Sequence, residues 1–148
     1  MNQTIDKFMQ AAIDEAKKGL AEGGIPIGSV IVKDGKIIGR GHNKRVQELN
    51  PILHAEIDCL QNAGRIGTYK DTILYSTLMP CYLCSGAIVQ FGIKKVYAGE
   101  SETFPGAKQF MEAHGVEVID LENEECKELM RNFIKNNPVL WNEDIGEL

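Results

Sequence analysis

His54-Ala55-Glu56 and Pro80-Cys81-Tyr82-Leu83-Cys84 are the two segments around which the rest of this sequence can be organised. Together they offer one imidazole and two thiols that can bind a metal ion, and one carboxylate, Glu56, that need not. Each segment stands near the expected start of a helix. Unpaired backbone N–H groups and the helix dipole favour thiolates at such a position. The two segments therefore predict a metal site at the ends of two helices.

The ligands expected from this pattern are His54, Cys81 and Cys84. A structural zinc site normally has four protein ligands, but the other histidines are poorly placed, His42 at a strand end and His114 in a late helix-to-loop region. Three ligands leave the fourth position for water, which is the catalytic arrangement. A Cys-x2-Cys pair alone would also suit a redox or structural zinc site, and a non-catalytic zinc-stabilised domain is the remote alternative.

Hydrophobic periodicity and turn residues divide the chain into helices and strands. Helices are expected over residues 4–20, 54–62, 81–91, 107–113 and 122–135, and strands over 27–32, 36–41, 72–77, 94–98 and 116–119. Lys33-Asp34-Gly35 predicts a tight hairpin, so the first two strands should be antiparallel and the sheet mixed. The pattern indicates an α/β fold, with a mixed five-stranded sheet and helices on both faces, in one domain over residues 1–148.

The composition restricts the classes of function. The chain has 148 residues, with 16 basic and 21 acidic side chains and a net charge of −5. Proteins that track phosphate backbones need a basic surface, so this balance argues against RNA or DNA as substrate. No apolar run approaches the ~20 residues of a membrane span, and residues 1–7 lack a signal-peptide pattern. We therefore expect a cytoplasmic protein without membrane contact, in which Cys59 and Cys126 are buried thiols.

With these residues in view, the chain resembles the cytidine and deoxycytidylate deaminase superfamily, whose zinc signature is His-x-Glu followed by Pro-Cys-x-x-Cys. Within it, the resemblance is to the small fungal-type cytosine deaminases. Further matching segments are Glu22-Gly23-Gly24-Ile25-Pro26-Ile27-Gly28, Gly39-Arg40-Gly41-His42-Asn43, Tyr69-Lys70-Asp71-Thr72, Gly86-Ala87-Ile88, and Trp141 followed by Glu143-Asp144-Ile145-Gly146-Glu147. The tail is the most specific of these, because the zinc motif is shared by deaminases of many substrates. The resemblance implies a three-layer α/β/α, cytidine-deaminase-like fold.

The resemblance also implies an activity, namely hydrolytic deamination of the free base cytosine to uracil and ammonia in pyrimidine salvage. The enzyme would be a homodimer with one zinc ion per subunit, which activates the attacking water, while Glu56 carries protons. The implied substrate contacts are Asn43 and the backbone N–H of Ala55 at the pyrimidine edge, Asp144 at the base and its amino group, Phe104 and Trp141 over the ring, and Ile27, Leu78 and Ile145 as apolar walls. The tail would act as a lid.

Several alternatives stay open in the sequence. Asn43 also suits an ordinary turn, and Trp141 an anchor for the tail. The chain departs from the fungal-type pattern at Ala55 (Gly in the family), Met79 (Ser) and Asn142 (an aromatic residue), and the first two are expected to contribute mainly through their backbones. Guanine, cytidine or adenosine in tRNA remain possible substrates of the same chemistry. A closing tail would occupy the space that a sugar needs, which favours a free base.

Overall fold

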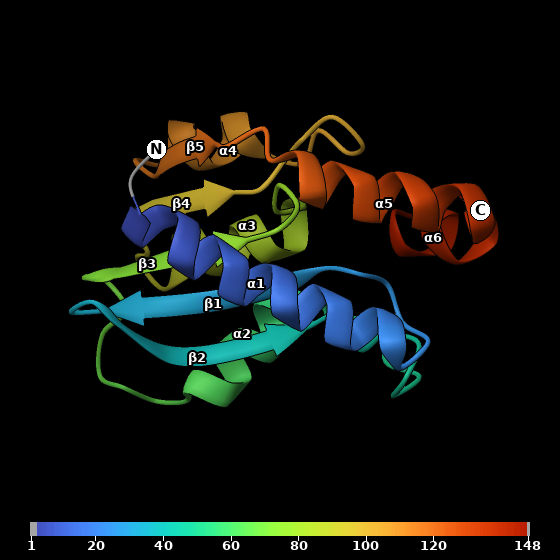
Figure 1. Cartoon of the computed structure of the whole chain (residues 1–148). Coiled ribbons are helices and arrows are strands. Elements are labelled where there is room, and N and C mark those ends of the chain that lie inside the picture. Colours follow the sequence, from blue (N-terminus) through green and yellow to red (C-terminus); the bar gives the residue numbers. More distant parts are fainter. Residues whose placement is uncertain (1–2, 148) are drawn as a thin grey trace.

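A mixed five-stranded sheet lies at the centre of the computed structural model, which describes residues 3–147 (Figure 1). The strands are β1 (Gly28–Lys33), β2 (Lys36–His42), β3 (Thr72–Ser76), β4 (Lys95–Ala98) and β5 (Glu117–Asp120), in the spatial order β2-β1-β3-β4-β5. β1 is antiparallel to β2 and to β3, whereas β3, β4 and β5 are parallel. The predicted mixed sheet is confirmed. The β1–β2 hairpin turns through Asp34 and Gly35, both with positive φ, as the Asp-Gly pair predicts.

Helices cover both faces of the sheet, which confirms the predicted three layers. One face carries α1 (Gln3–Ala21) and α5 (Glu124–Asn136), and the other carries α2 (Ala55–Ala63), α3 (Tyr82–Gln90) and α4 (Lys108–Ala113). These bounds lie within two residues of the predicted ones. Within residues 3–147, no helix combines the length and the apolar character that a membrane crossing requires.

Neighbouring residues of one strand pack into different layers. Val30 and Tyr75 face the layer of α1 and α5, whereas Ile31 and Leu74 face the layer of α2, α3 and α4. Side chains alternate between the two faces of a strand, so a sheet covered on both sides reads as a nearly continuous apolar run. The short strands of this chain have that composition because both of their faces are buried.

The tail around Trp141, for which the sequence predicts no helix or strand, forms a helix, α6 (Pro138–Asp144). Pro138 stands in its first turn, where a missing backbone N–H leaves no hydrogen bond unmade. Trp141, 5% exposed, packs with Met130 and Phe133 of α5 and with Leu78, which follows β3. The end of the chain is therefore folded back over the carboxyl end of β3. Residues 1, 2 and 148 of the predicted single domain lie outside the described residues.

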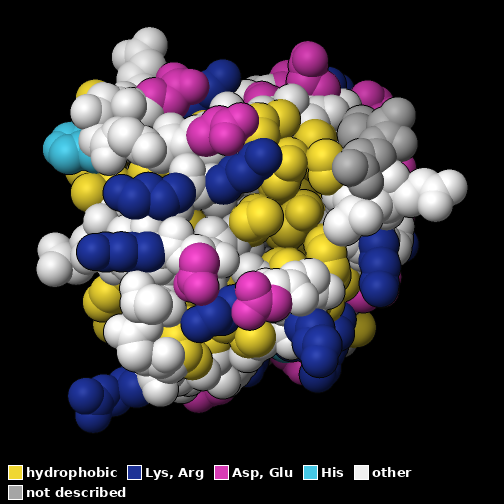
Figure 2. All heavy atoms as spheres, turned by 90° about the vertical axis from the view of Figure 1, so that its left-hand side faces the viewer, with side chains coloured by type: hydrophobic (Ala, Val, Ile, Leu, Met, Phe, Trp, Pro, Cys, Tyr) yellow, Lys and Arg dark blue, Asp and Glu magenta, His cyan; other side chains and the backbone are white. Residues whose placement is uncertain are grey.

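Charged side chains of both signs share the face shown in Figure 2. This is the end of the molecule where β1 ends and β4 begins. Lys33 Nζ lies 3.7 Å from Asp71 Oδ1, and Lys95 Nζ lies 3.8 Å from Glu117 Oε1. The lysines of this face are thus interspersed with carboxylates, and hydrophobic side chains lie between them.

Candidate functional site

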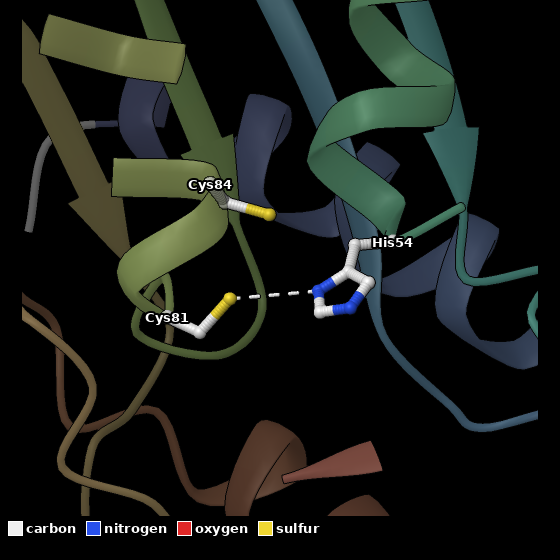
Figure 3. Close-up of side chains that lie close together, drawn as sticks. All are labelled: His54, Cys81 and Cys84. Carbon is white, nitrogen blue, oxygen red and sulfur yellow. Dashed lines mark hydrogen bonds between the residues drawn. The ribbon is translucent and has the colours of Figure 1, made fainter. Parts of the chain in front are cut away.

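The three expected metal ligands meet at the N-termini of two helices (Figure 3). His54 is the N-cap residue of α2, Cys81 is the N-cap residue of α3, and Cys84 lies in the first turn of α3. Their ligand atoms all lie within 4.8 Å of one another, and the Cys81 sulfur is 3.5 Å from His54 Nδ1. The two helices begin one residue later than the sequence predicted, at Ala55 and Tyr82, so His54 and Cys81 stand just before them. Both helices direct unpaired N–H groups toward this point, which favours negative charge on the sulfurs.

The protonation of the ligands suits a zinc ion. A hydrogen bond with Cys84 is the main reason that the pKa of Cys81 is lowered to about 4, and His54 lowers it further. The same hydrogen bond, together with burial, raises the pKa of Cys84 well above that of a free thiol. The lowered pKa of Cys81 favours its thiolate form, and a bound dication would displace the proton from Cys84. Two thiolates and one imidazole are a normal zinc donor set, and they leave a fourth position for water.

Glu56 lies beside this group in the first turn of α2 and is 5% exposed. Burial is the largest reason that its pKa is raised to about 7, and the charge of Cys81 adds to the effect. A carboxyl group with a pKa near neutrality can both accept and release a proton at working pH. Its position and its pKa therefore suit proton transfer.

A cavity of about 300 Å³ opens beside the ligand group. Its lining residues are Ile27, Asn43, His54, Glu56, Leu78, Met79, Cys81, Tyr82, Leu83, Phe104, Trp141, Asp144 and Ile145. Of the residues expected at the site, Cys84 and Ala55 do not border this cavity, and both are fully buried. Ala55 is the first residue of α2, where a backbone N–H has no carbonyl four residues earlier to bond. The fold therefore gathers residues from distant parts of the chain, from Ile27 to Ile145, around one space.

Two aromatic rings form one side of the cavity. Phe104 follows β4 and stands edge-on to Trp141 of α6, with ring centroids 5.8 Å apart and planes at 90°. The loop that carries Phe104 is fixed by Glu100, a fully buried carboxylate. Glu100 accepts hydrogen bonds from the backbone N–H of Thr103, at 2.9 Å, and from its hydroxyl group. The position of Phe104 is thus set by the loop as well as by contact with Trp141.

Polar groups converge on Asp144, another residue of the cavity lining. Arg45 Nη1 donates to Asp144 Oδ1 at 3.0 Å, and Asn43 Nδ2 donates to the same oxygen at 3.4 Å. Burial, the largest influence, raises the pKa of Asp144, although the charges of His54 and Arg45 oppose it. Arg45 was not among the residues expected from the sequence, which contains no local sign of a partner 99 positions away.

Three residues of the cavity lining were not expected from the sequence to face the site, namely Tyr82, Leu83 and, for its side chain, Met79. Tyr82 and Leu83 are the two variable positions of the Cys-x2-Cys segment, so their place in a first helical turn beside the ligands was the available signal. Met79 was expected to act mainly through its backbone. Its side chain is instead 1% exposed and forms part of both the core and the cavity wall.

The two other histidines have different partners. His42 lies 2.9 Å from Glu15 Oε1 through Nδ1 and 2.8 Å from Glu22 Oε1 through Nε2. His114 Nδ1 lies 2.9 Å from the carbonyl oxygen of Phe110. Within the described residues, His54 is the one histidine grouped with the cysteine pair.

Known proteins resemble this chain in both sequence and fold. A sequence profile described as the cytidine and deoxycytidylate deaminase zinc-binding region matches residues 2–100. A cytosine deaminase of Candida albicans is 50% identical over 144 residues, covering 95% of this chain and 96% of that protein. A tRNA-specific adenosine deaminase of Streptococcus pyogenes serotype M18 is 40% identical over 140 residues, covering 86% of this chain and 88% of that protein. A structure solved in a study of A-to-I editing by tRNA:A34 deaminases aligns with a TM-score of 0.76 and 29% identity, covering 84% of this chain and 99% of that one.

Proposed function

The chain belongs to the cytidine and deoxycytidylate deaminase family, and on this basis we propose that it hydrolyses the free base cytosine to uracil and ammonia. The observation that carries the proposal is the cavity, which combines a His-Cys-Cys group, a buried acid with a pKa of about 7, and a wall formed by α6. The 50% identity to a protein that is itself a cytosine deaminase supports this choice of base.

His54, Cys81 and Cys84 would hold the zinc ion. When bound, the ion supplies Lewis acidity that lowers the pKa of a water molecule toward ~7. Glu56 accepts a proton from the attacking water and passes it to N3 of the base, which makes C4 a better electrophile. Glu56 then carries the hydroxyl proton of the tetrahedral intermediate to the amino group, the C4–N bond breaks, and ammonia leaves. The two transfers account for every proton between cytosine plus water and uracil plus ammonia.

The rest of the cavity would bind and orient the base. A mainly apolar space with a few polar groups suits a flat heterocycle. The proposed contacts are Asn43 and the Ala55 backbone N–H at the pyrimidine edge, Asp144 at the amino group, Phe104 and Trp141 over the ring, and Ile27, Leu78 and Ile145 along its sides.

Adenosine in tRNA is the alternative substrate, supported by the 40% identity to a tRNA-specific adenosine deaminase. Two observations favour the free base over it. The net charge of the chain is −5, whereas a tRNA-binding surface needs an excess of positive charge. In addition, Trp141 and Asp144 of α6 and the adjacent Ile145 form part of the cavity wall, which leaves less room for the ribose of a nucleotide. Guanine or another amino-heterocycle could undergo the same reaction, but the 50% identity to a cytosine deaminase favours cytosine.

A homodimeric enzyme that acts in the cytoplasm in pyrimidine salvage forms part of the same proposal. Two large apolar side chains at the ends of α3 are exposed, Tyr82 at 76% and Phe91 at 50%. Exposed apolar side chains of this size support a subunit contact along α3. Sedimentation of the zinc-loaded protein should give the mass of two chains, and Tyr82→Glu should shift it toward one.

Turnover of cytosine tests the proposed reaction. Zinc-loaded protein should convert cytosine to uracil, seen by ultraviolet absorbance, with one ammonia released per uracil formed. A fully zinc-loaded protein that leaves cytosine unchanged would contradict the proposal.

A further inference from the structure

A buried ion pair fastens the last turn of α6 to the loop that follows β2. Arg45 Nη1 lies 3.0 Å from Asp144 Oδ1, and the two side chains are only 11% and 6% exposed. Asn43 Nδ2 reaches the same oxygen at 3.4 Å. The other contacts of α6 with the body are largely apolar, through Trp141 and its neighbours. Apolar contacts have little directionality, so the ion pair is what determines where Asp144 points.

Arg45 is itself held in place. Its Nε donates to the carbonyl oxygen of Pro51 at 2.8 Å, and its backbone N–H donates to Asn43 Oδ1 at 3.0 Å. The guanidinium is therefore oriented by its own loop, and its rigid planar fork needs little further ordering to meet Asp144. The bond to Asn43 Oδ1 also turns the Asn43 amide nitrogen toward Asp144.

Arg45 thus fixes two side chains of the cavity wall, Asn43 and Asp144, without being part of that wall itself. A carboxylate that is buried without a partner is strongly unfavourable. If the guanidinium were lost, Asp144 would gain by turning to solvent, and the end of α6 would move outward with it. The side of the cavity that excludes a sugar would then open.

We propose that Arg45 is a positioning residue that aims Asp144 into the cavity and keeps α6 closed, and thereby selects a free base over a nucleoside. The proposal rests on the proposed function for its choice of substrates. Arg45 acts through its contact with Asp144, so the loss of Arg45 should reproduce part of the effect of losing Asp144.

The first test does not require turnover. Trp141 is the single tryptophan of the chain and lies on α6, so quenching of its fluorescence by acrylamide reports how closed α6 is. Arg45→Gln should increase the quenching of the zinc-loaded protein, and Arg45→Lys, which keeps the charge but not the fork, should increase it less. Arg131→Gln is the matched control, because Arg131 is 41% exposed and pairs with surface glutamates of α5 and the loop after β4. It should leave quenching unchanged.

The second test uses substrates. Arg45→Gln should raise KM for cytosine by about 10- to 100-fold, the range for a hydrogen bond to a charged group, with a smaller change in kcat. The ratio of activity on cytidine to activity on cytosine should rise. Adding Arg45→Gln to Asp144→Asn should change KM little beyond the effect of Asp144→Asn alone, because Arg45 acts on the substrate through Asp144.

The outcomes separate this proposal from the proposed function. If the wild-type protein does not convert cytosine, the proposed function fails, and the quenching of Arg45→Gln still decides whether Arg45 holds α6. Unchanged quenching, or an unchanged KM in a cytosine-active protein, overturns the proposal. If Arg45→Gln does not fold, quenching of Arg45→Lys and Asp144→Asn gives the same decision.

Discussion

The Cys81 sulfur lies 3.5 Å from His54 Nδ1, although 27 positions separate the two residues in the chain. They meet because α2 and α3 cover the same face of the sheet and begin at the same end of it. The two helix N-termini surround the sulfurs and the imidazole with unpaired N–H groups. The site for a cation is therefore built by the packing of two helices on one sheet.

The ligand group should bind zinc in a way that depends on each of its members. Cys81→Ser should reduce the zinc content from about one ion per chain to none, because a hydroxyl group is a much poorer zinc ligand than a thiolate. The melting temperature should fall as well, since metal binding stabilises the folded state. Metal analysis and thermal unfolding measure both effects. Cys59→Ala is the control, because Cys59 is buried elsewhere and bonds the carbonyl oxygen of Gly39. If it lost zinc equally, the assignment of the ligands would be wrong.

Glu56→Gln should keep zinc but lower kcat by about 10²–10⁴-fold, the usual contribution of a general acid–base group. The substitution keeps the shape of the side chain and removes its ability to carry a proton. Steady-state kinetics and zinc content should be measured on the same sample. Asp58→Asn is the matched control, because Asp58 is a second buried carboxylate of α2 that bonds His42 N and Lys44. Asp58→Asn should lower the free energy of unfolding and leave kcat nearly unchanged. Turnover of Glu56→Gln at the wild-type rate would support the non-catalytic interpretation instead.

Phe104→Ala should raise KM for cytosine by several-fold, up to ~10-fold, since an aromatic pair contributes about 0.5–1.5 kcal/mol beyond its buried area. The change removes the edge-to-face contact with Trp141 and one wall of the cavity. Phe110→Ala removes an equally large ring that is 36% exposed on α4 and should leave KM unchanged. If both substitutions raised KM equally, the effect of Phe104→Ala could not be attributed to a contact between Phe104 and the base.

Stability should fall in acid through Glu15. Burial, the largest influence, raises the pKa of Glu15, but hydrogen bonds with His42 and Arg40 outweigh it and lower this pKa below the ordinary 4.5. A group whose pKa is lowered by folding stabilises the protein above its unfolded-state pKa and loses that contribution as the pH falls through its folded-state pKa. Urea unfolding should therefore show the wild-type advantage over Glu15→Gln at pH 6 and its loss below about pH 4.5. An equal difference at both pH values would exclude this role for Glu15.

The sheet could be predicted from sequence because its signals are local. Asp34-Gly35 marks the hairpin, and runs such as Thr72–Ser76 are short, apolar and bounded by turns. Helix α6 was missed for an equally physical reason. It has only seven residues, too few to show a helical period, and its first residue is Pro138, which can end one helix or begin the next.

The ligand set could be predicted from residue chemistry, but the cavity could not. Chemistry singles out His54, Cys81 and Cys84, whereas Trp141 and Asp144 were assigned to the site only through resemblance to a family. The Arg45–Asp144 contact joins residues 99 positions apart, and no periodicity or motif carries information over that distance. Only the packing of α6 on the body reveals it.

The central claim is that this chain acts on the free base cytosine. It is tested most directly by measuring kcat/KM of the zinc-loaded protein on cytosine and, side by side, on cytidine, guanine and a tRNA substrate. The account predicts rapid conversion of cytosine to uracil, with cytidine and tRNA left unchanged. Preferential turnover of cytidine, guanine or tRNA over cytosine would keep the zinc chemistry and contradict the substrate assigned to this cavity.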